Sequence, residues 1–129
     1  DIITPNETEA EELTGLKVSS IDEAFIAAKQ LQKKGIAAVA ITFGSNGVVY
    51  VDKEQEIYQE AFKVDAIDTT GAGDAFNGAL AVSTAQGMKI KDSLRFAAAT
   101  ASLCVTRKGA QTSMPTKQEV ESFMAEKGL

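Results

Sequence analysis

The sequence predicts an α/β fold, because short strand-like apolar runs alternate along the chain with segments of helical spacing. The run IAAVAIT (residues 36–42) lacks the polar alternation of a solvent-facing strand, which indicates a strand buried on both faces. The runs VVYVD (residues 48–52) and EIYQEAFKV (residues 56–64) flank the charged turn KEQE and predict an antiparallel pair. At 129 residues, the chain is one domain or part of one.

The segment before residue 16 predicts a strand followed by a short helix. The run DIIT (residues 1–4) is apolar and β-branched, as in a buried strand. Because the chain starts at Asp1 within this run, we expect it to be the later part of a longer protein. PNETEAEELTG (residues 5–15) predicts a turn and an acidic helix that ends at Gly15.

A second helix is expected between Ser20 and Gly35. Ser20 and Glu23 have the spacing of a capping box, and apolar residues recur after them at helical intervals. The glycine at position 35 ends the pattern. After the buried strand, FGSNG (residues 43–47) predicts a turn.

The last half of the chain predicts three helices. AGDAFNGALAVSTAQG (residues 72–87) and the Ala-rich KDSLRFAAATASLCVTR (residues 91–107) form two of them. KGAQTSMP (residues 108–115) is expected as a loop, and Thr116 with Glu119 caps the last helix.

The composition excludes several classes of function. A net charge of −5 disfavours a broad nucleic-acid interface, and no apolar run approaches the roughly 20 residues that cross a membrane. The absence of His excludes a catalytic triad with an imidazole base. The lone Cys104 excludes an internal disulfide and a Cys/His zinc site, and with no secretory signal at the start it predicts a cytoplasmic protein.

The stretch DTTGAGD (residues 68–74) is the most informative part of the sequence. Gly71 and Gly73 allow the backbone to approach a ligand, and the free N–H groups of the following helix suit an anion. Asp74 lies in the first turn of that helix, where an ordinary capped helix also favours Asp. A dinucleotide fingerprint is excluded because Phe76 stands where its third Gly is needed, and no P-loop motif occurs.

The longer string DTTGAGDAFNGAL resembles the C-terminal signature of the ribokinase family of carbohydrate kinases, also called the PfkB family. ITPNETEAEELTG resembles the segment of that family with an N-x-x-E motif, and VTRKGAQTSMP resembles its closing loop. The resemblance implies a three-layer α/β/α ribokinase-like fold with a mostly parallel sheet and an antiparallel meander, truncated at the N-terminus. Residues 1–129 would be the C-terminal portion, which carries the ATP side and the catalytic base.

The activity that the resemblance implies is ATP-dependent phosphorylation of a sugar hydroxymethyl group. The substrate that the resemblance favours is D-ribose, which would give ribose 5-phosphate. Another kinase of the family, such as a fructokinase or a nucleoside kinase, and a non-catalytic nucleotide-binding module remain alternatives. The sugar pocket and the lid of the family lie in the N-terminal half, so we expect the chain alone to be inactive. The intact protein is expected to be a homodimer that pairs through this lid.

The resemblance assigns the reaction to the DTTGAGD turn. Asp74 matches the base that takes the proton of the sugar hydroxyl, and the amides of Gly71, Ala72 and Gly73 match the anion hole. A potassium ion beside the hole would be held mostly by backbone carbonyls. The implied set for this cation is Asp68, Thr70, Cys104, Arg107, Gly109 and Ser113. The Cys104 thiol itself is expected to be a small buried group rather than a reactive one.

Three further stretches are matched to ATP and magnesium. Asn6 and Glu9 match the motif that organises Mg²⁺ near the phosphates, although the same pair is a good capping box. The turn at residues 42–47 is matched to the phosphates and ribose, and an ordinary hairpin turn is its alternative. The matched positions there are Thr42, Gly44 and Gly47. An adenine pocket is implied between residues 64–67 and the helix at residues 98–102, with Ala98 as its lining residue.

Overall fold

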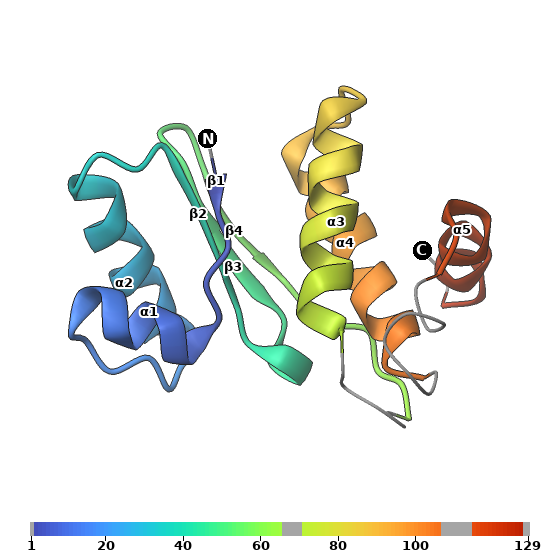
Figure 1. Ribbon diagram of the computed structural model, residues 1–129, viewed down its shortest axis with the longest axis horizontal. Helices are drawn as coiled ribbons and strands as arrows, with labels where there is room; N and C mark the ends of the chain where they lie inside the picture. Colours follow the sequence, from blue (N-terminus) through green and yellow to red (C-terminus); the bar gives the residue numbers. More distant parts are fainter. Residues whose placement is uncertain (1, 66–70, 107–114, 128–129) are drawn as a thin grey trace. The chain divides into compact units, whose positions relative to one another are not determined.

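The computed structural model describes residues 2–65, 71–106 and 115–127. The described strands lie in the first part of the chain together with helices, and the elements described after them are helices (Figure 1). The strands are β1 (Ile2–Ile3), β2 (Ala38–Thr42), β3 (Val48–Val51) and β4 (Glu56–Gln59). The helices are α1 (Glu7–Thr14), α2 (Ile21–Lys33), the 3₁₀ turn η1 (Gly44–Asn46), α3 (Ala72–Ala85), α4 (Ile90–Cys104) and α5 (Lys117–Glu126). The predicted α/β class is confirmed.

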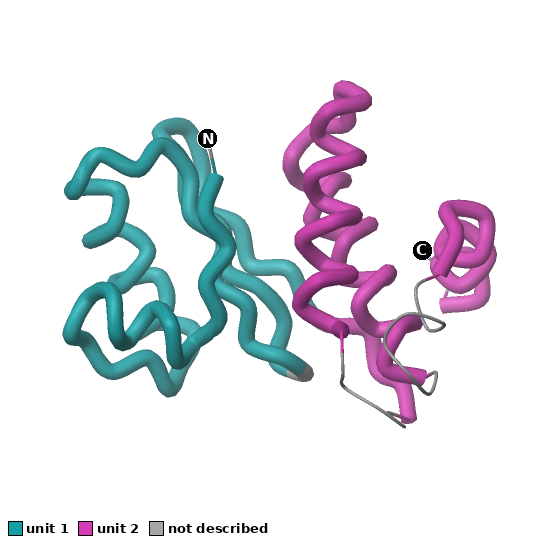
Figure 2. Tube along the Cα trace, viewed as in Figure 1, with its two compact units in different colours: residues 1–60 teal, residues 61–129 magenta. Residues whose placement is uncertain are grey.

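The chain forms two compact units, Asp1–Glu60 and Ala61–Leu129 (Figure 2). The first unit contains the sheet with α1 and α2, and the second contains α3, α4 and α5.

The sheet of the first unit has the strand order β1-β2-β3-β4 among the described residues. β1 is parallel to β2, with Ile2 opposite Ala38. β2, β3 and β4 form the predicted antiparallel meander. The parallel share of the sheet is therefore smaller than the mostly parallel arrangement implied by the resemblance, because the meander supplies two of the three pairings described here.

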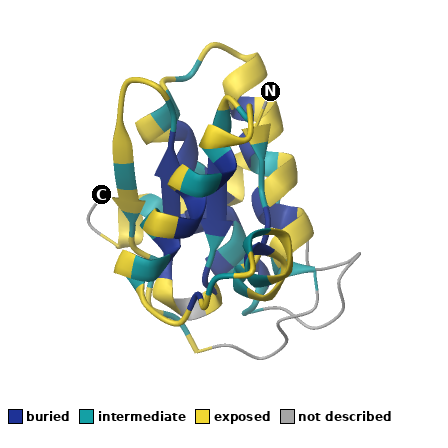
Figure 3. Ribbon diagram, turned by 90° about the vertical axis from the view of Figure 1, so that its left-hand side faces the viewer, coloured by how far each residue is buried: buried dark blue, intermediate teal, exposed yellow. Residues whose placement is uncertain are grey.

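The core of the first unit lies between the sheet and the helices α1 and α2. Val39, Ala40 and Ile41 of β2 are fully buried, in agreement with the absence of polar alternation in this run, and Figure 3 colours the chain by burial. Small residues of α2 pack onto this strand and β3, and they let the helix approach the sheet closely. The α2 residues in this core are Ala24, Ala27, Ala28 and Leu31.

The predicted helix boundaries in this unit follow from local hydrogen bonds. α1 ends at Gly15, whose φ of 72° is the left-handed cap that favours glycine. At α2, the Ser20 hydroxyl accepts the N–H of Glu23 at 3.1 Å, but the Glu23 carboxylate returns to Ser19 instead of Ser20. The predicted capping box is thus half formed, because Ser19 offers that carboxylate both its N–H and its hydroxyl.

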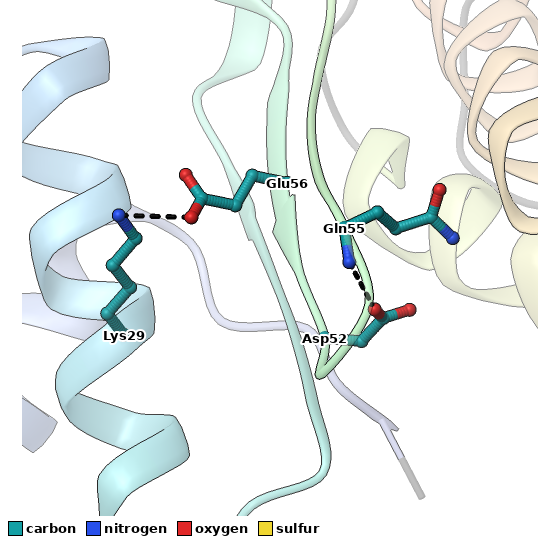
Figure 4. Close-up of polar contacts among 4 residues, drawn as sticks. All are labelled: Lys29, Asp52, Gln55 and Glu56. Carbon is teal, nitrogen blue, oxygen red and sulfur yellow. Dashed lines mark hydrogen bonds and ion pairs between the residues drawn. The ribbon is translucent and has the colours of Figure 1, made fainter.

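The turn between β3 and β4 is organised by Asp52. Its Oδ1 accepts the N–H groups of Glu54 and Gln55 at 2.7 and 2.9 Å, and the latter bond is drawn in Figure 4. The Tyr50 hydroxyl donates to Oδ2 at 2.7 Å.

An ion pair of 3.1 Å between Lys29 of α2 and Glu56 joins the helix to β4 (Figure 4).

In the second unit, α3 packs along α4, and α5 packs against α4 in an apolar cluster. Phe62 and Val64 join this cluster, and the Phe62 ring stacks on Phe123 at 5.6 Å between centroids. The predicted strand over residues 56–64 therefore ends early, at Gln59. Phe62 and Val64 pack, partly buried, in the cluster with α4 and α5 instead of continuing the ladder, and the Phe62 N–H donates to Ser102 Oγ.

The C-terminal helices agree with the sequence in their starting signals. Thr116 and Glu119 form a complete capping box at α5. α4 ends at Cys104, three residues before the predicted end at Arg107, which lies outside the described residues. Within the described ranges, no helix has both the length and the apolar character required to cross a bilayer.

Candidate functional site

Among the residues that the structure describes, no side chain caps the N-terminus of α3. Gly71 is the N-cap, with φ 82° and ψ 0°, and it contributes no side chain to the first-turn amides. The first helical bond runs from the N–H of Ala75 to the Gly71 carbonyl at 2.8 Å. The N–H groups of Ala72, Gly73 and Asp74 precede that bond, so they have no partner four residues back within the helix. The positive end of the helix dipole therefore lies at the predicted anion site.

Gly73 is not required by the local backbone. It has no left-handed φ, and a Cβ added to it would meet no atom within 4 Å. A glycine in a helix also lowers stability relative to alanine. Internal packing and backbone conformation thus leave this glycine unexplained, whereas close approach of a ligand to the helix end would require it.

Asp74 lies at the third position of α3 and its side chain is exposed. A carboxylate there interacts favourably with the helix dipole, which accounts for part of its placement. Because it is exposed, its carboxylate is open to a ligand, as a general base must be.

Of the residues implied for the potassium site, only Cys104 is described. It is fully buried at the last position of α4, as expected for a small apolar side chain. Asp68, Thr70, Arg107, Gly109 and Ser113 lie outside the described residues. Among the described residues, no cluster of three or more His, Cys, Asp or Glu side chains is suited to a metal ion.

Of the stretch at residues 64–67 that is implied for the adenine pocket, residues 64 and 65 are described, and they belong to the same unit as α4. Val64 packs in the same apolar cluster as Ala99 of α4. The N–H of Phe62 donates to Ser102 Oγ at 3.3 Å, which links the same irregular segment to the helix. Ala98 lies on this helix and is 6% exposed.

In the first unit, the other candidates gather where β1 and β2 end. The N–H of Thr42 donates to the Pro5 carbonyl at 3.0 Å, and Asn6 forms a parallel bridge with Thr42. The motif that begins at Asn6 is thereby placed beside the loop that begins at Thr42. The carboxyl ends of parallel strands are the usual position of ligand loops in α/β sheets.

Asn6 and Glu9 form a complete capping box at α1. Asn6 Oδ1 accepts the Glu9 N–H at 2.8 Å, and Glu9 Oε1 accepts the Asn6 N–H at 3.0 Å. The capping alternative is therefore present in the structure. Both side chains remain exposed, and a carboxylate has acceptor sites beyond a single bond, so a ligand role is compatible with the cap.

The loop at residues 42–47 is a short 3₁₀ turn closed by its own backbone. Phe43 donates to the Gly47 carbonyl at 2.8 Å, and Asn46 donates to the Phe43 carbonyl at 3.0 Å. Gly44 and Gly47 have φ angles of 55° and 98°, which other residues rarely adopt. The turn by itself thus accounts for both glycines, whether or not the loop binds a nucleotide.

Sequence reasoning missed one contact of this loop. The Tyr58 hydroxyl of β4 donates to the Asn46 carbonyl at 2.6 Å. A tyrosine in a strand twelve residues after a loop carries no local signal, because only the strand register brings the two together.

Comparison with known proteins identifies the family. The sequence pattern described as "pfkB family carbohydrate kinase" matches residues 1–117. The chain therefore belongs to the pfkB family of carbohydrate kinases.

Similar proteins within the family include ribokinases and deoxyribokinases. The chain is 46% identical over 124 residues to the ribokinase of Haemophilus influenzae, covering 96% of this chain and 40% of that protein. It is 37% identical over 125 residues to the deoxyribokinase of Salmonella typhi, covering 97% of this chain and 41% of that protein. The chain thus spans about 40% of the length of these curated relatives.

Solved structures confirm the ribokinase-like fold class. The ribokinase of Arabidopsis thaliana, solved with ribose and ATP, matches with a TM-score of 0.91 and 40% identity, over 96% of this chain and 40% of that one. An Escherichia coli protein assigned as a ribokinase II, solved with ATP and Mg²⁺, matches with a TM-score of 0.88 and 28% identity, over 98% of this chain and 39% of that one.

Proposed function

We propose that the intact protein, meaning the gene product that contains this chain, phosphorylates the hydroxymethyl group of D-ribose with ATP to give ribose 5-phosphate. The observation that carries the proposal is the start of α3, where the N-cap Gly71 leaves the first-turn amides without a side-chain partner of its own and Asp74 presents an exposed carboxylate. The family membership and the similarity to ribokinases support ribose as the sugar. The Arabidopsis relative solved with ribose and ATP supports the pair of substrates.

The residues of α3 account for the chemistry. The Asp74 carboxylate accepts the proton of the attacking sugar hydroxyl. The hydroxyl oxygen bonds to the γ-phosphorus of ATP while the bond from that phosphorus to the bridging oxygen breaks, and ADP leaves with the electron pair. The amides of Ala72 and Gly73 meet the negative charge on the transferring group, and this stabilisation supplies most of the catalysis in a loose transition state.

Residues outside α3 would bind ATP and Mg²⁺. Thr42, Gly44 and Gly47 would contact the phosphates and ribose, and Ala98 of the second unit would line the adenine pocket. Asn6 and Glu9 would orient Mg²⁺ and its water, and the exposed carboxylate of Glu9 fits a hard cation that prefers oxygen ligands. Bound with ATP, Mg²⁺ neutralises phosphate charge.

Three further parts of the proposal rest on the family resemblance or on composition. A potassium ion would lie beside the anion hole, held by the residues from Asp68 to Ser113 named above. The intact protein would pair as a homodimer through a lid that precedes this chain. A cytoplasmic location follows from the lone Cys104 and the metabolic role.

Kinase assays with a set of different acceptors distinguish this function from its alternatives. ADP release by the intact protein is measured with ATP and D-ribose, 2-deoxyribose, fructose or a nucleoside as acceptor. We expect the highest kcat/KM with D-ribose. Preference for 2-deoxyribose would instead follow the Salmonella relative, and preference for fructose or a nucleoside would favour another kinase of the family. ATP binding without turnover of any acceptor would identify a non-catalytic module.

The 129-residue chain by itself is expected to show negligible turnover of ribose in the same assay, since it spans about 40% of the length of its relatives. Turnover comparable to that of the intact protein would contradict the expectation that the sugar pocket lies outside this sequence.

A further inference from the structure

Tyr58 links the edge of the described sheet to the candidate nucleotide loop. Its hydroxyl donates to the Asn46 carbonyl at 2.6 Å, although the two residues are twelve positions apart. The register of the β3–β4 hairpin produces this contact, because Val49 pairs with Tyr58 and Val48, the first residue after the loop, pairs with Gln59. The ring thus lies one residue pair from the point where the loop enters β3.

The stability of the fold does not by itself require the hydrogen bond between Tyr58 and Asn46. Its side chain is 42% exposed, so the ring contributes modestly to the core. Asn46 is exposed as well, so water could bond its carbonyl in place of the hydroxyl. The hydrogen bond is not needed to satisfy a buried polar group.

The loop gains a connection that its own bonds do not supply. The described backbone bonds of residues 43–47 join these residues to one another. Two residues of the loop, Gly44 and Gly47, adopt positive φ angles. A glycine backbone has many accessible conformations, so fixing these two residues costs much conformational entropy. The bond from Tyr58 ties the peptide of Asn46 to the neighbouring strand β4 and reduces that freedom before a ligand arrives.

We propose that Tyr58 is a positioning residue for nucleotide binding, which acts by holding the loop at residues 42–47 in its ligand-ready shape. The inference rests on the proposed function, in which this loop contacts the phosphates and ribose of ATP. Pre-ordering a loop strengthens binding because the ordering cost is met in the free protein.

The test is the substitution Tyr58→Phe in the intact protein. It removes the hydroxyl and keeps the ring, so the sheet packing is retained. We expect the KM for ATP to rise about threefold to tenfold, the range of one exposed hydrogen bond, while kcat and the KM for the sugar stay unchanged. Hydrogen exchange of the Asn46 and Gly47 amides should become faster in the free protein.

Tyr50→Phe is the matched control. Tyr50 also donates its hydroxyl across a short distance, to Asp52 Oδ2, but at the opposite end of the same hairpin. It should leave the KM for ATP and the exchange of the loop amides unchanged.

The outcomes separate this inference from the function on which it rests. Turnover with an unchanged KM for ATP in Tyr58→Phe would overturn the inference alone. Equal increases in both KM values together with a lower Tm would assign Tyr58 a structural role and would also overturn it. A wild-type protein that neither binds nor turns over ATP would refute the proposed function, and the inference with it.

Discussion

The backbone N–H of Thr42 donates to the carbonyl oxygen of Pro5 at 3.0 Å. This bond joins the end of β2 to the residue before the N-cap of α1. The Asn6–Glu9 motif and the loop that starts at Thr42 therefore cannot separate without breaking it. Two stretches of sequence 36 positions apart are held as one local structure, counted from Asn6 to Thr42.

Glu9→Gln should separate the two roles of the Asn6–Glu9 motif. Glutamine keeps an oxygen that can accept the Asn6 N–H, so the capping box is retained, and the free energy of unfolding should fall only by the helix-dipole interaction of the lost charge, about 0.3–1 kcal/mol. It removes the negative charge, so the Mg²⁺ concentration for half-maximal activity should rise about tenfold or more. The measurement is kinase activity of the intact protein as a function of Mg²⁺, together with urea unfolding.

Glu119→Ala controls for loss of a cap, because Glu119 forms the same box with Thr116 at α5. Glu9→Ala and Glu119→Ala should each lower the free energy of unfolding by about 0.3–1 kcal/mol, because each removes a carboxylate from the first turn of its helix. Only Glu9→Ala should change the Mg²⁺ requirement. If both variants lose stability and neither changes that requirement, Glu9 is a capping residue alone.

Asp74→Asn should abolish most of the activity with little effect on folding. Loss of the general base lowers kcat by about 10² to 10⁴-fold. The stability cost is limited to the interaction of an exposed carboxylate with the helix dipole, about 0.3–1 kcal/mol. The measurements are kcat at saturating substrates and urea unfolding of the same intact protein.

Asp92 of α4 provides the matched control for Asp74. It too is exposed and stands three residues after the N-cap of its helix. Asp92→Asn should therefore cause the same small loss of stability while kcat is retained. A comparable fall in kcat for both variants would remove the special role of Asp74.

Much of the local structure could be predicted from sequence, because its causes are local. The cap at Asn6 and the left-handed end at Gly15 depend on residues within one or two turns. Gly71, the N-cap of α3, likewise has a positive φ of 82°, which glycine adopts freely, whereas Gly73 within the helix does not.

The errors arose where distant residues decide the backbone. The end of β4 depends on Phe62, whose N–H bonds Ser102 forty positions later. The link between Tyr58 and Asn46 likewise requires the hairpin register. At the candidate site, sequence could name Asp74 and Glu9 by motif, but the proximity of Asn6 to Thr42 became visible only with the strand pairing.

Gly73→Ala should impair catalysis without destabilising the fold. The added methyl meets no atom within 4 Å, and alanine favours helix over glycine, so stability should stay the same or rise by up to about 1 kcal/mol. A methyl at the anion site would displace the transferring phosphoryl group, and a shift of about 1 Å can lower kcat about a hundredfold. Unfolding and kcat are measured on the same preparation.

Gly78→Ala is the control within the same helix. Gly78 is exposed in the middle of α3, and a Cβ there also meets no atom within 4 Å. This variant should gain up to about 1 kcal/mol of stability and keep its activity. If Gly73→Ala behaves in the same way, the anion site does not require a glycine at position 73.

The bond between Tyr50 and Asp52 should make stability depend on alkaline pH. Burial raises the pKa of the Tyr50 hydroxyl, and its hydrogen bond to the Asp52 carboxylate and the negative charge of that group raise it further. The pKa in the unfolded chain is about 10, so the stabilising contribution is fully present below pH 10. It is lost as the pH rises above 10, because the unfolded chain then releases a proton that the folded protein retains. This pH dependence is measured by urea unfolding of wild type and Tyr50→Phe between pH 8 and pH 11. The difference in the free energy of unfolding in favour of wild type should shrink over that interval. A difference that does not change with pH would show that folding does not shift the pKa of Tyr50.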